Sequence, residues 1–494
     1  MTLRTDALTA TIERDAHGRR TLVVTAEDTT RLDAFEGDGG PAGSSVAADG
    51  GAAGRDGAPA GGYQLRGPLS AANAAALRTA VDNLRPRPLG TGRSIGTGDR
   101  LGLATPGHAR AFQEHGHGVT PVFAQQSIRE MDRLGRTAQQ VLDDATFGCV
   151  EAGWSGGVGA DADHIKTTEG IDRGLAAGFT TFTLDPGDHV VDPDQVTGDV
   201  TSLVPWSDLE ADAASLVRRY GGHQVDVDGE TVTATEHDLL RAAVKYGAAI
   251  AETVRLSRHL RDHARHDVEI EVAIDETDLV TSAVEHYYVA AELERLGVRW
   301  VSLAPRYADG FEKGVEYLGQ VEALAANLRG HTAVAEQFGG YKISLHSGSD
   351  KFSIYPAAVE ATKGRIHLKT SGTSYLSALE VAARQAPDLL REIYGVSRES
   401  YRKARASYQV SADVDRTPDP ASVPDADLPE LVTAFDSRQM LHVGYGDVLT
   451  AVDGAGQRYF DAALREVLTV NTELYATVLA DHLGRHVAPF AVTG

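Results

Sequence analysis

Residues 268–275 read Val268-Glu-Ile-Glu-Val-Ala-Ile-Asp275, a run in which acidic and aliphatic side chains alternate. In an extended strand successive side chains point to opposite faces, so Glu269 and Glu271 share one face while Ile270 and Val272 share the other. This pattern fits a barrel strand whose aliphatic side chains pack on surrounding helices and whose acidic side chains point to the barrel axis. The run therefore predicts one strand of a β/α barrel with polar groups inside.

Seven further short runs alternate with longer helical patterns, which is typical of repeated βα units with a parallel sheet. The eight predicted strands are residues 101–104, 121–124, 161–165, 179–184, 268–274, 299–303, 342–345 and 365–368. Eight strands are the number that a closed barrel requires. We therefore predict the α/β class and a (β/α)8 TIM-like barrel, with an open doubly wound sheet as the alternative.

Three segments do not fit the repeat. We predict an N-terminal extension at 1–92 with a flexible Gly/Ala-rich loop at 37–62, a catalytic barrel at 93–376 with an insertion after its fourth strand at 190–266, and a helical C-terminal extension packed on the barrel at 377–494. Within the insertion, Asp228-Gly-Glu predicts a hairpin turn.

Charge and cysteine content exclude several classes of protein. The chain has 494 residues and a net charge of -23, with 70 acidic against 47 basic residues, which argues against a nucleic-acid partner. Its single cysteine, Cys149, cannot form an intramolecular disulfide and suits a reducing compartment. Without a signal sequence or a long apolar run, the chain is expected to be cytoplasmic and away from membranes. The oligomeric state is left open.

Polar side chains gather where predicted strands end, the place where barrel enzymes carry their chemistry. His164 and Lys166 share one face of the predicted third strand, and His367 and Lys369 share one face of the eighth; His346 ends the seventh. Imidazoles and carboxylates together bind Zn, Mn, Ni, Co or Fe. We therefore expect a divalent metal, with the candidate ligands His164, Asp185, Glu271, His346 and His367.

Each of these residues alone has a simpler interpretation. A histidine at a strand end is often only hydrogen-bonded, and Asp185 before Pro-Gly could form an Asx turn. Because all of them point to one axis, the shared site is favoured. Two interpretations of His442 remain: it could cap the barrel mouth from the C-terminal helix, or it could simply pack there.

The common cofactor and nucleophile motifs are missing or out of context. Gly96-Thr-Gly98 does not have the spacing of a dinucleotide loop, and it precedes the predicted strand that it should follow. Gly153-Trp-Ser-Gly-Gly157 matches a nucleophile elbow only formally, because a predicted strand follows it where a helix is needed. Neither motif predicts a site.

Several stretches resemble the tagaturonate/fructuronate epimerase family of bacterial hexuronate catabolism. They are Gly98-Asp-Arg-Leu-Gly-Leu-Ala-Thr-Pro-Gly-His108, Val122-Phe-Ala-Gln-Gln-Ser127, Gly159-Ala-Asp-Ala-Asp-His-Ile-Lys-Thr167, Thr183-Leu-Asp-Pro-Gly-Asp-His189, Leu345-His-Ser-Gly-Ser-Asp-Lys-Phe-Ser-Ile-Tyr-Pro356 and His367-Leu-Lys-Thr-Ser-Gly-Thr-Ser-Tyr375. The resemblance implies metal-dependent interconversion of D-tagaturonate and D-fructuronate, with side activity on the neutral ketohexoses. The binding partner that the resemblance implies is a small-molecule sugar-acid substrate.

The chemistry of that reaction suggests roles for the residues at the mouth. The inverted carbon is β to the ketone, so its C–H bond is not acidic, and either retro-aldol cleavage with re-addition or a transient oxidation is needed. Without a dinucleotide motif we favour the retro-aldol route, assisted by the metal as a Lewis acid. The catalytic candidates are Lys166, His189, Asp275 and Lys369, and the substrate-binding candidates are Gln125, Arg306, Ser347, Asp350, Lys351 and Thr370.

Two other functions remain as alternatives. A metal-dependent aldolase, or one that forms a Schiff base at Lys369, would release the aldehyde instead of recapturing it. A sugar-acid binding protein would use the same residues without turnover.

Overall fold

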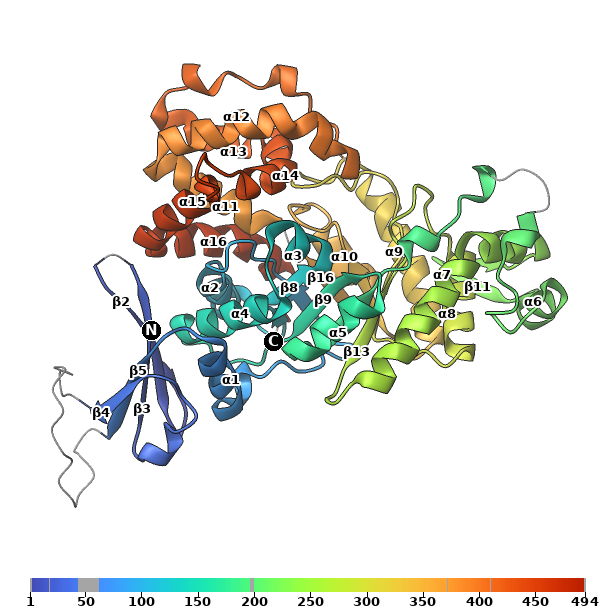
Figure 1. Ribbon diagram of the computed structural model, residues 1–494. Helices are drawn as coiled ribbons and strands as arrows, with labels where there is room; N and C mark the ends of the chain where they lie inside the picture. The colour runs from blue at the N-terminus through green and yellow to red at the C-terminus, as the bar shows by residue number, and fades with distance from the viewer. Residues whose placement is uncertain are drawn as a thin grey trace.

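The computed structural model describes residues 2–16, 18–42, 62–195, 200–370, 372–408 and 410–492. Its central sheet is parallel, in the order β7 (Thr120–Val122), β6 (Ser94–Gly96), β16 (Ile366–Lys369), β15 (Lys342–Leu345), β14 (Ser302–Ala304), β13 (Glu269–Ala273), β10 (Thr181–Leu184), β9 (Ala160–Ile165) and β8 (Ala124–Ser127). Only Phe123 separates β7 from β8 along the chain, and these two pieces pair with β6 and β9 respectively. The sheet therefore closes, and the predicted (β/α)8 barrel is confirmed (Figure 1).

The strand alternation predicted from the sequence sets the two faces of this barrel. Phe182, Ile270 and Leu368 are fully or almost fully buried in the apolar core. The other face carries buried polar side chains such as Thr183 and Glu271, which lie side by side on the paired strands β10 and β13. Charged residues thus fill a volume that aliphatic side chains fill in most barrels of this kind.

Helices cover the outside of the barrel. They are α2 (Thr105–His115), α3 (Ile128–Leu134), α4 (Ala138–Ala152), α5 (Thr168–Ala177), α7 (Glu236–His263), α8 (Ala283–Arg295), α9 (Val321–Gln337), α10 (Tyr355–Ala361) and α11 (Thr373–Gln385). The separation of α3 from α4 follows from Gly135, which is left-handed at the end of α3, and from a capping box between Thr137 and Gln140.

The prediction of a strand at residues 101–104 is wrong. The first barrel strand is β6, and the Asp99 carboxylate accepts hydrogen bonds from the backbone amides of Leu101, Gly102 and Ala104. These bonds wrap the chain into a turn before α2, which a local apolar pattern does not reveal.

The N-terminal region forms a separate antiparallel sheet beside α4 (Figure 1). Its strands run in the order β1 (Leu3–Arg4), β2 (Thr9–Arg14), β3 (Arg20–Ala26), β5 (Tyr63–Gly67) and β4 (Asp38–Pro41), and α1 (Ala71–Ala80) follows. Most of the predicted flexible loop, residues 43–61, lies outside the described residues. Its start differs from the prediction, since β4 pairs with β5.

The insertion holds α6 (Ala213–Tyr220) and the predicted hairpin, formed by β11 (Gln224–Val227) and β12 (Glu230–Thr233). The C-terminal helices α12 (Pro387–Ala404), α13 (Leu428–Thr433), α14 (Phe435–Thr450), α15 (Tyr459–Val470) and α16 (Thr472–Val487) share a second apolar core with α11 and pack on the barrel (Figure 1). Among the described residues, every helix is too short or too polar to span a lipid bilayer.

Candidate active site

Lys369 lies at the centre of the polar barrel interior. Its Nζ is 3.0 Å from Asp161 Oδ2, 2.6 Å from Asp163 Oδ1 and 2.7 Å from Glu271 Oε1, and it also donates to Thr183 Oγ1 at 2.7 Å. Burial opposes the charge on Lys369, but the three carboxylates outweigh it and raise its pKa well above the ordinary value. Lys369 is therefore a permanent cation that neutralises a buried acidic cluster.

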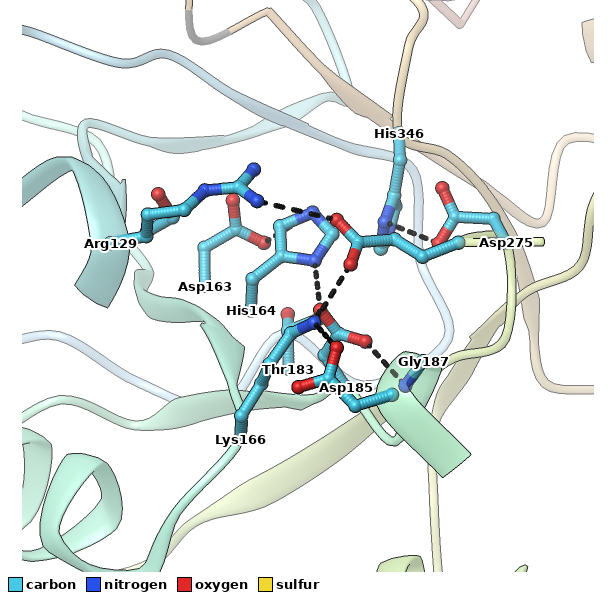
Figure 2. Close-up of polar contacts among 12 residues, drawn as sticks. Arg129, Asp163, His164, Lys166, Thr183, Asp185, Gly187, Asp275 and His346 are labelled. Atoms are coloured by element: carbon cyan, nitrogen blue, oxygen red, sulfur yellow. Dashed lines mark hydrogen bonds and ion pairs between the residues drawn. The ribbon is translucent and has the colours of Figure 1, made fainter. Parts of the chain in front are cut away.

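His346, at the end of β15, lies between two carboxylates. Its Nε2 is 2.6 Å from Glu271 Oε1, and its Nδ1 is 3.3 Å from Asp275 Oδ1 (Figure 2). Burial and the Lys369 ammonium oppose its protonation, but the Asp275 and Glu271 carboxylates raise its pKa to about 10. Within the described structure, His346 Nδ1 and Asp275 Oδ1 are both buried without a hydrogen-bond partner.

His164 approaches the same point from β9. Its Nδ1 is 3.0 Å from Asp185 Oδ2 and its Nε2 is 3.9 Å from Asp163 Oδ1, and its ring meets that of His346 edge-on at 5.0 Å between centroids (Figure 2). The backbone of His164 is left-handed, with φ of 50°, and the pairing of β9 with β10 shifts register here. This irregularity brings Asp163 and His164, two consecutive residues, into one site.

The predicted orientation of this strand is corrected by the same irregularity. Strict alternation of side chains predicts that His164 and Lys166 point into the barrel, and it gives no role to Asp161 and Asp163. The two aspartates instead face the barrel interior and bind Lys369. The acidic pair in Ala160-Asp-Ala-Asp163 was a visible period-2 signal that could have found them.

Lys166, one of the predicted catalytic residues, is ion-paired and partly exposed. Its Nζ lies 2.7 Å from Asp188 and 2.9 Å from Glu276, and its side chain is 30% exposed. Burial lowers its pKa, but the bonds with Asp188 and Glu276 and the charge of Asp185 raise it above the ordinary value. It is held as a cation at the rim of the site.

Other predicted residues lie away from this centre. His367 Nδ1 meets Ser94 Oγ at 2.8 Å, and burial lowers the pKa of His367 to about 3. Exposed His189 lines a separate surface hollow beside Glu252 and Arg255. Thr370 bonds the Gly96 carbonyl through both its amide and its hydroxyl.

Lys351 and Asp350 are engaged within the protein. Lys351 donates to the carbonyls of Glu312, Val315 and Ser349, and burial lowers its pKa to about 8. Asp350 forms ion pairs with Arg438 at 3.1 Å and with His482 at 2.8 Å, which join the loop after β15 to α14 and α16.

Two groups of side chains are close enough to suggest a metal site: His164, Asp185 and Glu276 near the outer cavity, and Asp350, His482 and His486 between the loop after β15 and α16. The second group looks like a site only by its spacing. His486 Nε2 accepts a hydrogen bond from the Asp350 amide, and its Nδ1 is bonded to the His482 carbonyl. Both imidazole nitrogens are engaged, so this cluster anchors the loop and does not suit a metal.

Two connected cavities open at the carboxyl ends of the strands. The outer cavity has a volume of 520 Å³ and is lined by Arg129, His164, Asp275, Glu276, Thr277, Asp278, Arg306, Phe311, Lys313, His346, Ser347, Ala406 and Tyr408. The inner cavity has a volume of 60 Å³ and is lined by Arg100, Ser127, Arg129, Glu130, Asp163, His164, Lys313, His346, Ser349, Lys369, Gly372, Tyr408 and His442. Five residues line both cavities: Arg129, His164, Lys313, His346 and Tyr408.

Some predicted residues do join this site, and several lining residues were missed. Arg306 and Ser347 line the outer cavity, and Gln125 donates to Asp163 Oδ2 at 2.9 Å. His442, left open above, lines the inner cavity from α14. The missed side chains are Arg100, Arg129, Lys313 and Tyr408. Arg100 stood within a stretch that carried the family resemblance, whereas the others had no local signal.

Comparisons with known proteins agree with this fold and with the resemblance found in the sequence. A family model described as tagaturonate epimerase (UxaE) matches residues 51–490. A tagaturonate/fructuronate epimerase from Thermotoga maritima is 42% identical over 419 residues, covering 84% of each chain.

Crystal structures give the same result. The fructuronate-tagaturonate epimerase UxaE from Cohnella laeviribosi is 30% identical, with a TM-score of 0.88 for its complex with two glycerols and 0.86 for its native form. The alignments cover 100% and 99% of this chain, and 96% and 95% of the crystallised ones. The chain therefore belongs to the tagaturonate epimerase family.

Proposed function

We propose that this chain interconverts D-tagaturonate and D-fructuronate in the cavities at the carboxyl end of the barrel, with the help of a divalent metal. The observation that carries the proposal is a pair of buried atoms on the wall of the outer cavity, His346 Nδ1 and Asp275 Oδ1, which lie 3.3 Å apart and have no hydrogen bond within the described structure. Family membership supports the substrate pair. A cytoplasmic location stays a prediction.

The donor atoms around this pair fit a metal. Glu271 accepts a hydrogen bond from His346 Nε2, which leaves His346 Nδ1 to bind a metal. Asp185 is bonded to His164 Nδ1, which leaves His164 Nε2 to bind the same metal. A carboxylate behind each imidazole fixes its orientation, as is usual for metal-binding histidines. We assign His164, His346 and Asp275 as ligands, a set of two histidines and one carboxylate that leaves positions open for a substrate.

This assignment modifies the one made from the sequence. Asp185 and Glu271 move from ligands to the residues that orient the histidines. Asp275 moves from the acid–base group to the ligands. His367 leaves the site because it lies deeper in the barrel against Ser94.

When bound, the metal would supply a Lewis acid that polarises the ketone and stabilises negative charge on its oxygen. The protein must then hold the two fragments of the retro-aldol step and exclude water. His442 and Tyr408, whose chain segments follow the barrel in sequence, help to enclose the inner cavity. The enclosure allows the aldehyde to be recaptured after it turns its other face.

Glu276 is the side chain best placed to accept the hydroxyl proton. It follows the ligand Asp275, lines the outer cavity and is 33% exposed, with Oε2 bonded to Lys166 and Oε1 3.9 Å from Arg129. It therefore reaches the substrate space without being locked in the barrel core.

A Schiff-base mechanism at Lys369 is disfavoured. A nucleophilic lysine must lose its proton, and three carboxylates within 3.0 Å hold this one as an ammonium. Borohydride with substrate is accordingly expected to leave the enzyme active.

Proton NMR of the enzyme with D-tagaturonate tests the proposed function. We expect D-fructuronate to appear, to stop appearing after EDTA, and to reappear when one of Mn, Ni, Zn or Co is restored. If no metal produces D-fructuronate, the substrate assignment fails. If the reaction proceeds unchanged after exhaustive chelation, the Lewis-acid role fails.

A further inference from the structure

Arg100 is a buried cation that the site described so far does not use. It lies between β6 and α2, and its Nε and Nη2 both contact Glu130 Oε1, at 3.0 and 2.5 Å. Its guanidinium stacks on the Tyr445 ring of α14 at 3.5 Å from the centroid. These contacts fix the plane of the guanidinium from two sides.

One edge of this guanidinium is unpaired. Within the described structure, Arg100 Nη1 is buried without a hydrogen-bond partner, although the residue lines the inner cavity. A buried N–H group without a partner is costly in a folded protein, and a fixed guanidinium matches a carboxylate geometrically. The free edge is therefore suited to a negatively charged ligand.

Lys313 adds positive charge at the same cavity. Its Nζ donates to Ser347 Oγ at 2.9 Å, and it forms no ion pair with a carboxylate among the described residues. Two further cations line this cavity. Lys369 is already balanced by Asp161, Asp163 and Glu271, and Arg129 lies 3.9 Å from Glu276. Lys313 therefore adds a charge that no described carboxylate pairs with and that is left for a ligand.

His164 and His346, the proposed metal ligands, line the same cavity as Arg100 and Lys313. Both sugar acids have a carboxylate at one end of the carbon chain and the ketone next to the other end. A substrate whose ketone end meets the histidines could therefore place its carboxylate against these cations.

We propose, on the basis of the proposed function, that Arg100 and Lys313 bind the substrate carboxylate in the inner cavity and so determine the preference for uronates over neutral ketohexoses. Tyr445 acts as a positioning residue because it holds the Arg100 plane. The competing candidate is Arg306, which lines only the outer cavity.

The test compares Lys313→Met, Arg100→Lys and Arg306→Met, with Lys363→Met as a control for the loss of a surface charge, since Lys363 is exposed and paired with Glu336. The readout is the ratio of kcat/KM for D-tagaturonate to kcat/KM for D-tagatose. Each variant is also titrated with D-galactonate and galactitol, which differ only in the carboxylate, so that the comparison does not depend on turnover.

We expect Lys313→Met to lower the ratio, and the relative affinity for D-galactonate, by at least about 30-fold, as for the loss of a buried charged partner. Arg100→Lys should lower both in the same direction, because lysine lacks the planar fork. Lys363→Met should leave both values unchanged.

A loss of preference in Arg306→Met alone, or unchanged preference in both Lys313→Met and Arg100→Lys, would overturn the assignment. Those outcomes would leave the epimerase function standing, since it is judged by whether D-fructuronate forms in the wild-type enzyme.

Discussion

His346 Nδ1 and Asp275 Oδ1 face each other at 3.3 Å, buried, and neither has a hydrogen-bond partner among the described residues. They form an ion pair with each other, and two atoms that can both bind a metal, held this close, are the arrangement expected of neighbouring ligands to one ion. His346 follows β15, and Asp275 lies in the loop after β13. The spacing of these strands in the sheet therefore sets the distance between the two proposed ligands.

Replacing His346 by Gln should abolish most metal binding and epimerisation. We expect metal affinity to fall by more than the roughly 10–100-fold that is typical when a residue hydrogen-bonded to a metal ligand is replaced. Metal content and the NMR rate at saturating metal measure it. His331→Gln is the matched control, because His331 is also buried with an unpartnered nitrogen but lies in α9 outside the cavities. Equal losses in both variants would contradict the assignment.

Glu271→Gln should weaken metal binding without removing it. Glu271 orients His346 and contributes negative charge behind it, so we expect metal affinity to fall about 10–100-fold, with activity partly restored by excess metal. Glu269→Gln makes the same change two residues earlier in β13, where the carboxylate binds the amides of Leu89 and Gly90. Calorimetric titration of both variants with metal measures the two affinities. An equal fall in both would mean that Glu271 acts through its charge alone and not through its bond to His346.

Lys369→Met should destabilise the fold strongly. It leaves Asp161, Asp163 and Glu271 as uncompensated buried charges, for which about 3–5 kcal/mol is typical. Urea unfolding should show a smaller loss at pH 5 than at pH 8, because the crowded carboxylates of the variant can then take up protons. A pH-independent loss would mean that packing, not charge, is what Lys369 contributes.

Acid should destabilise the protein through histidines that are buried in the neutral form. Burial lowers the pKa of His331 to about 3, below the 6.5 of an unperturbed histidine. The unfolded chain therefore binds more protons between these values, and the stability that this group contributes is lost as the pH falls below 6.5. Between pH 7 and pH 5 the loss from His331 is about 2 kcal/mol. In His331→Gln, urea midpoints at the two pH values should differ by correspondingly less.

Gly372→Ala should disturb the inner cavity. A Cβ at this position would lie 2.0 Å from Cε1 of His442, so the ring must move, at a cost of about 1–3 kcal/mol. We expect lower stability together with reduced kcat. Gly395→Ala, at an open helical position in α12, is the control and should be neutral or stabilising. Full activity in Gly372→Ala would show that His442 is not needed at the mouth.

Much of the barrel could be predicted because its strands repeat a local rule. Ile270 and Val272 alternate with Glu269 and Glu271 in the sequence, and the same residues separate into an outer and an inner face in the structure. His346 was placed at the mouth because it follows a predicted strand, and it does follow β15 and line the cavities. The local rule failed at residues 101–104, where three side-chain-to-amide bonds from Asp99 override the apolar pattern.

The site beyond the strands could not be predicted from local patterns. Period-2 alternation holds only for a regular strand, so the sequence could not show that the left-handed backbone of His164 brings this residue into the same site as its neighbour Asp163. Lys313 stands in a loop without periodicity, and its charge acquires meaning only because no described carboxylate pairs with it.

The sequence by itself determined the fold class, the polar barrel interior and the histidines at its mouth, since these depend on the spacing of neighbouring residues. Only the tertiary structure decided which atoms remain free: Glu271 takes one nitrogen of His346, and Tyr445, far along the chain, holds Arg100 with one edge unpaired. The physical reason is that hydrogen-bond satisfaction and charge balance are properties of a surrounding in three dimensions, to which distant segments contribute.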